Sequence, residues 1–78
     1  MNLSQLELGQ YAIIHDFTDV DMSVKLMEMG CLPGEIVQLV KIAPFGDPIS
    51  ISVAGYELSL RRKEASTVLV KNLQWVKV

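Results

Sequence analysis

The stretch ISISVAGYELSL, from Ile49 to Leu60, decides the fold of this chain of 78 residues. Apolar residues occupy every second position on both sides of Ala54-Gly55: Ile49, Ile51 and Val53 before it, and Tyr56, Leu58 and Leu60 after it. Because the side chains of a strand point alternately to its two faces, this spacing predicts two strands that each bury one face. Ala54-Gly55 supplies a turn between them, so the stretch is typical of a β-hairpin.

Three further strands are predicted, two before this hairpin and one after it. Ile36 to Ile42 is a mostly apolar run, and the loop APFGDP (Ala43 to Pro48), with two prolines and a glycine, joins it to the hairpin. Tyr11 to Phe17 is interpreted as the first strand and Val68 to Val70 as a last, short one. Within the loop, the Asp47 carboxylate is expected to accept backbone N–H bonds.

Two short helical turns are predicted outside the strands. Ser4 to Leu8 forms the first, with Ser4 as its N-cap and Glu7, three residues later, completing a capping box. The second lies in the charged segment from Arg61 to Ser66. Trp75 in the tail indicates that the carboxyl-terminal segment docks on the domain.

One longer helix is predicted from Val20 to Met29, between the first two strands. N-cap oxygens are offered by Thr18, Asp19 and Asp21, and the early negative charges suit the positive end of the helix dipole. Gly30 stands where a left-handed C-terminal cap is needed, and Pro33 prevents the helix from continuing.

Five short strands with one helix inserted after the first fit a small, partly open β-barrel better than a sandwich. A sheet of this size needs closure or cover to protect its edges. A chain of 78 residues has no room for a second hydrophobic core, so residues 1–78 are expected to form a single domain. The predicted fold class is therefore mainly β, with one helix and short helical turns.

The charge and the cysteine content disfavour two classes, nucleic-acid-binding proteins and disulfide-bonded secreted proteins. The chain has seven Lys and Arg residues and a formal net charge of −2, which disfavours nucleic acid as a partner. Its single cysteine cannot form an internal disulfide. The amino-terminal segment lacks the pattern of a secretory signal, and no apolar run approaches the roughly 20 residues that span a bilayer. We therefore expect a soluble, cytoplasmic protein that meets a membrane only through a partner.

The sequence lacks the patterns of a catalytic or metal site. Its one His and one Cys, His15 and Cys31, lie sixteen positions apart, and Cys31 is interpreted as a small packing residue rather than a nucleophile. His15 and Asp16 are adjacent, so on a regular strand they point to opposite faces. We expect no enzyme activity, no dedicated metal ligands and no cofactor, with binding of Fe²⁺ or another divalent ion as a weak alternative. The basic group Arg61 to Lys63 is interpreted as a solvated turn or, alternatively, as a contact for an acidic partner.

Three segments in order resemble the FeoA family of small proteins of bacterial ferrous iron transport. They are LSQLELGQYAII (Leu3 to Ile14), LMEMGCLPGEIVQLV (Leu26 to Val40) and APFGDPISISVAGYELSLRRKEA (Ala43 to Ala65). The shared features are a helix ending in L-x-x-x-G-x-x-P-G, the loop P-x-G-D-P and a strand ending in L-R-R-x-E-A. Each motif is weak alone, whereas the ordered set is specific and covers roughly Leu3 to Val70.

The resemblance implies an SH3-like barrel with a helical insertion and an accessory role beside FeoB, a membrane permease with a cytosolic GTP-binding domain. It implies no catalytic residues. A similar domain occurs at the carboxyl end of iron-dependent repressors of the diphtheria-toxin type. The leading hypothesis is a module that binds and modulates a FeoB-type permease; the alternative is a metal-responsive regulatory domain. Whether the protein activates or inhibits transport, and whether it self-associates, stays open.

The predicted helix carries two apolar stripes, and one of them is the candidate contact surface. The stripes are Val20, Val24 and Met27, and Met22, Leu26 and Met29. A single helix on a small barrel needs only one buried stripe, and methionines suit a contact that repacks on association. We therefore expect the partner to bind the second stripe and the turn after it, a surface made of Met22, Leu26, Met29, Cys31 and Leu32, unless both stripes belong to the core.

Overall fold

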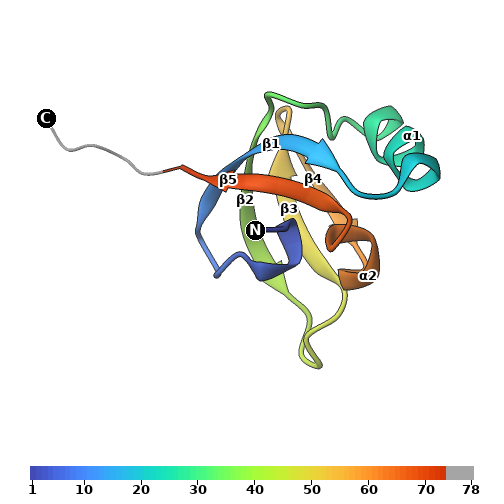
Figure 1. The fold of residues 1–78 in the computed structure, drawn as a ribbon. Helices are drawn as coiled ribbons and strands as arrows, with labels where there is room; N and C mark the ends of the chain where they lie inside the picture. The colour runs from blue at the N-terminus through green and yellow to red at the C-terminus, as the bar shows by residue number, and fades with distance from the viewer. Residues whose placement is uncertain (74–78) are drawn as a thin grey trace, which may run out of the picture.

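The computed structural model describes residues 1–73, which form a curved, five-stranded antiparallel sheet with one helix at a corner (Figure 1). The elements, in chain order, are the 3₁₀ turn η1 (Leu3–Gln5), β1 (Tyr11–Phe17), α1 (Val20–Glu28), β2 (Ile36–Ile42), β3 (Ile49–Val53), β4 (Tyr56–Leu60), α2 (Arg62–Ala65) and β5 (Val68–Asn72). The strand order is β4-β3-β2-β1-β5, and the sheet is open between its edge strands β4 and β5. The predicted fold class and the position of the helix are confirmed.

The core fills the inside of the curved sheet. Its fully buried side chains come from every strand and from η1, α1 and α2; the largest are Leu3, Ile14, Leu26, Leu39, Ile49, Ile51 and Leu60. In β3 every second residue is buried, as the period of two predicts. In β4 only Leu60 is fully buried, and the first residue of the strand, Tyr56, is 45% exposed. The reason is that β4 lies at the edge of the sheet.

The hairpin between β3 and β4 turns at Ala54 and Gly55. Both have positive φ angles, 50° and 87°, which the two-residue turn of a twisted hairpin requires. The paired strands run from Val53 opposite Tyr56 to Ile49 opposite Leu60. The predicted hairpin and the position of its turn are therefore confirmed.

The amino-terminal turn begins earlier than the sequence predicts. Asn2, not Ser4, caps it: the Asn2 side chain accepts the Ser4 N–H, and the Gln5 side chain accepts the Asn2 N–H at 2.7 Å. The predicted capping box of Ser4 and Glu7 is therefore wrong. The cause is tertiary, since Leu3 is fully buried and the segment pairs with β5 through Asn2 and Leu69.

Strand β1 is irregular next to its end. Its pairing with β5 shifts register between Ile14 and Asp16, which marks a β-bulge. Both His15 and Asp16 are exposed, so neither side chain is part of the core at this point of the strand. The last strand reaches Asn72, two residues beyond the predicted end, and the predicted docking of Trp75 lies outside the described residues.

Candidate partner-binding surface

Helix α1 begins and ends with the caps that its sequence predicts. Asp19 is the N-cap, and its carboxylate accepts the Met22 N–H at 3.0 Å. At the other end Gly30 adopts a φ angle of 103°, its N–H bonds to the Met27 carbonyl, and the Cys31 N–H bonds to the Leu26 carbonyl at 2.9 Å. This pair of bonds is the Schellman motif, which places the residue after the glycine against the last turn of the helix.

The Schellman motif determines which face of α1 meets the core. Leu26 and Cys31 are both fully buried, and Met22 and Met29 are half-buried against the core. The prediction that this stripe is the exposed one is therefore wrong, and Leu26 and Cys31 are not available to a partner in the folded domain. A signal was present in the sequence: an apolar residue directly after a C-terminal glycine packs on the helix residue five positions before it.

At α1, exposed apolar side chains lie on the other stripe and in the turn after the helix. Val20 is 81% exposed, Val24 is 52% exposed, and Leu32, the one predicted site residue that is well exposed, is 45% exposed. We call Val20, Val24 and Leu32 the α1 surface. Val20 and Val24 replace Leu26 and Cys31 as candidate contacts, and Leu32 is kept. The candidate region is still the helix and the turn after it.

Tyr56 fastens the end of α1 to the sheet. Its hydroxyl, at the start of β4, donates to the Met29 carbonyl. The same hydroxyl lies where a side chain at Gly30 would extend. Gly30 is therefore required twice, for its positive φ angle and for the close approach of Tyr56.

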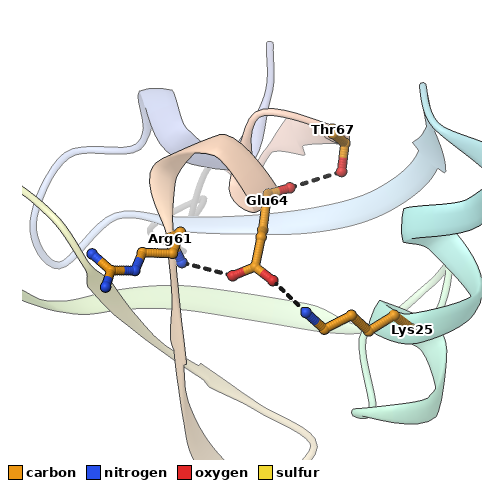
Figure 2. A network of polar contacts seen from close by, with 4 residues as sticks. All are labelled: Lys25, Arg61, Glu64 and Thr67. Carbon is orange, nitrogen blue, oxygen red and sulfur yellow. Dashed lines mark hydrogen bonds and ion pairs between the residues drawn. The ribbon is translucent and has the colours of Figure 1, made fainter.

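Glu64 holds the middle of α1 against α2, as Figure 2 shows. Its carboxylate accepts from Lys25 Nζ at 2.8 Å and from the Arg61 backbone N–H at 2.9 Å. The Thr67 hydroxyl donates to the Glu64 carbonyl at 2.7 Å. The hydrogen bond from Lys25, followed by that from Arg61, lowers the pKa of Glu64, so the ionised carboxylate ties the two helices together.

Arg62 joins three segments that are distant in the sequence. Its guanidinium donates Nε–H to the Gly46 carbonyl and Nη1–H to the Ser4 carbonyl, the latter at 2.8 Å. Its backbone N–H donates to the Asp47 carboxylate at 3.0 Å, which confirms the predicted role of Asp47 as an acceptor. Arg62 is thus a structural residue that links η1, the β2–β3 loop and α2.

The residues considered for catalysis and metal binding differ in their exposure. Cys31 is fully buried, and burial raises the pKa of its thiol, whereas His15 is exposed on the β1 bulge. Within residues 1–73, no hydrogen bond joins these two side chains. The same residues contain no cluster of three or more His, Cys, Asp or Glu side chains. None of the helices between residues 1 and 73 has the length and apolar character needed to cross a bilayer.

Comparison with known proteins places this architecture in a family. The model of the FeoA domain matches residues 1–72. An Fe(2+) transport protein A/Fe(2+) transporter FeoB fusion protein of Porphyromonas gingivalis is 33% identical over 72 residues, which are 91% of this chain and 8% of that protein. This chain therefore spans less than a tenth of its curated relative.

Two solved structures share the fold over nearly their whole length. A FeoA-like protein of Clostridium acetobutylicum is 30% identical, with a TM-score of 0.89, covering 100% of this chain and 92% of that one. FeoA of Stenotrophomonas maltophilia, solved with zinc and described as an SH3 domain protein and a candidate ferrous iron transport activating factor, is 32% identical, with a TM-score of 0.80, covering 91% and 89%. The fold, the ordered motifs and these matches agree, and the chain belongs to the FeoA domain family.

Proposed function

We propose that this protein is a non-enzymatic, cytoplasmic accessory protein of ferrous iron transport, which binds and modulates the cytosolic domain of a FeoB-type permease. The observation that carries the proposal is the fusion protein, in which a homologous domain and FeoB form one chain. Fusion holds two domains at an effective concentration of about millimolar, which favours even a weak contact between them.

The α1 surface is the contact that we propose for this partner. Val20 and Val24 are exposed on one side of a helix whose other side is fixed to the barrel. Three features hold the helix in place: the buried Leu26, the ion pair of Lys25 with Glu64, and the hydroxyl of the β4 tyrosine. A rigid helix that presents apolar side chains loses little conformational entropy on binding.

Isothermal titration calorimetry with the purified cytosolic domain of the permease tests this function. We expect saturable binding of the wild-type protein and at least roughly tenfold weaker binding of Val24→Lys, because a charge at this position must be desolvated on contact. Leu8→Lys is the matched control, since Leu8 is 64% exposed and lies outside α1. Equal affinity of both variants and the wild type would move the contact away from α1, and absence of wild-type binding would contradict the proposed function.

The alternative function, a metal-responsive regulatory domain, draws support from the zinc complex of the Stenotrophomonas maltophilia relative. In this chain the two strongest potential ligands differ in exposure: His15 is exposed and Cys31 is buried. Titration with Fe²⁺ and Zn²⁺, followed by measurement of oligomeric state, separates this function from the leading one.

A further inference from the structure

The β2–β3 loop presents one aromatic side chain entirely to solvent. Phe45 is 100% exposed, and Ile42 at the base of the loop is 41% exposed. The loop projects beyond the sheet at the bottom of Figure 1, at the opposite end of the molecule from α1. A phenylalanine with no contacts contributes nothing to the core, so packing does not explain its place in the loop.

The backbone around Phe45 is fixed. The Gly46 N–H bonds to the Ala43 carbonyl at 2.7 Å, which closes a turn around Phe45, and the Ala43 N–H bonds to the Pro48 carbonyl at 3.0 Å. Arg62 then ties the loop to the barrel from outside, through the Gly46 carbonyl and the Asp47 carboxylate. An aromatic ring on a fixed backbone loses little entropy when it is buried by a partner.

A positive charge lies at the foot of the loop. Arg61 is adjacent to Arg62, whose N–H holds Asp47, and the pairing of Leu60 with Ile49 brings it beside the foot of the loop. The Arg61 side chain points away from Glu64 and Lys25 (Figure 2), and in the part of the chain that the structure describes it forms no ion pair. The one carboxylate of the loop, Asp47, is already engaged by a backbone N–H.

We propose that Phe45 and Arg61 form an anchor for a protein partner, with Phe45 inserted into an apolar pocket and Arg61 paired with a carboxylate at its rim. Aromatic residues and arginine are the residues most often found at binding hot spots. The partner is the permease domain, so the inference rests on the proposed function and adds to it a second contact, remote from α1. A lipid surface fits less well, because membrane binding draws on clusters of about 4–8 basic residues and this chain has a net charge of −2.

Calorimetry with the permease's cytosolic domain tests the anchor. We expect at least roughly tenfold weaker binding of Phe45→Ser, and weaker binding of Arg61→Ala with a smaller dependence on salt. Leu8→Ser is the matched control, because it removes an exposed apolar side chain outside the loop and should leave affinity within about twofold. Circular dichroism during thermal unfolding confirms that each variant folds, which the exposure of Phe45 predicts.

The other outcomes contradict the anchor, and they show whether the proposed function also fails. If Phe45→Ser binds as tightly as the wild type while Val24→Lys does not, the function stands and the anchor falls. If the wild type does not bind the domain, both fall. A second arm uses vesicles containing phosphatidylglycerol, and sedimentation velocity of the protein alone. Loss of vesicle binding or of self-association in Phe45→Ser, with unchanged affinity for the permease domain, would assign the ring to lipid or to a second copy and contradict the anchor.

Discussion

Replacing Arg62 with alanine should destabilise the domain more than any other substitution of a charged residue in α2. The change removes two guanidinium hydrogen bonds, to the carbonyls of Gly46 and Ser4, and frees the β2–β3 loop from the amino-terminal turn. Hydrogen bonds of a charged group contribute about 1.5–3 kcal/mol each. Because Arg62 is half-buried and water can replace part of these bonds, we expect a total loss of about 2–4 kcal/mol.

Urea denaturation followed by circular dichroism measures this loss. Small domains have unfolding free energies of about 5–15 kcal/mol, so the midpoint should shift clearly, and the melting temperature should fall by roughly 10 °C or more. Arg62→Lys keeps the charge but not the two-pronged geometry, and should fall between the wild type and Arg62→Ala. Because alanine has the highest helix propensity, a loss of stability in Arg62→Ala does not come from a weaker helix.

Arg61→Ala is the matched control for this measurement. The Arg61 side chain is exposed, and its backbone N–H, which Glu64 accepts, survives the substitution. Its unfolding free energy should stay within about 0.5 kcal/mol of the wild type. Equal, small effects of Arg61→Ala and Arg62→Ala would refute the role of Arg62 as the tie between the three segments.

Four further predictions concern stability, pH, metal binding and catalysis. Gly30→Ala should cost at least about 1–2 kcal/mol more than Gly9→Ala in urea denaturation, since both positions have positive φ but only the first meets the hydroxyl of the β4 tyrosine; equal losses would refute the contact. Because its hydrogen bonds lower the pKa of Glu64, the carboxylate adds stability above the unfolded-state pKa of about 4.3, and this stability is lost as the pH falls through the folded value. Glu64→Gln should therefore cost about 1 kcal/mol or less at pH 7, and less as the pH is lowered through that range. Parallel stability profiles of this variant and the wild type would contradict that. Replacing His15 and Cys31 together with alanine should leave weak metal binding unchanged by titration, and loss of a tight stoichiometric site would show a true metal centre. The purified wild type should not hydrolyse GTP or ATP, and turnover that copurifies with the protein in size exclusion would overturn the non-enzymatic assignment.

The local pattern was sufficient for most of the fold. Alternation defines β3, and the apolar run from Ile36 to Ile42 coincides with β2, because both depend on the period of the strand itself. The start of α1 and the conformation of Gly30 also follow from neighbouring residues. Features set within a few positions of a residue were therefore predictable.

Features set by distant contacts were not. The face that α1 buries depends on the packing of Leu26 and Cys31 inside the barrel, and the expectation that the partner binds this stripe overlooked the apolar residue after Gly30. The partners of Arg62 lie 16 and 58 positions away, so no local pattern could indicate them. The β1 bulge at His15 is likewise a property of its pairing with β5. Phe45 is exposed because its loop projects from the sheet, and the loop motif P-x-G-D-P does not indicate this projection.

Calorimetric titration of the 78-residue protein into the cytosolic domain of a FeoB-type permease is the sharpest test of the proposed function. We expect saturable, one-to-one binding that Val24→Lys weakens and Leu8→Lys leaves unchanged, with both variants folded by circular dichroism. Absence of binding by the wild type at the highest concentrations at which both proteins stay soluble, with the permease domain shown to bind GTP, would contradict it.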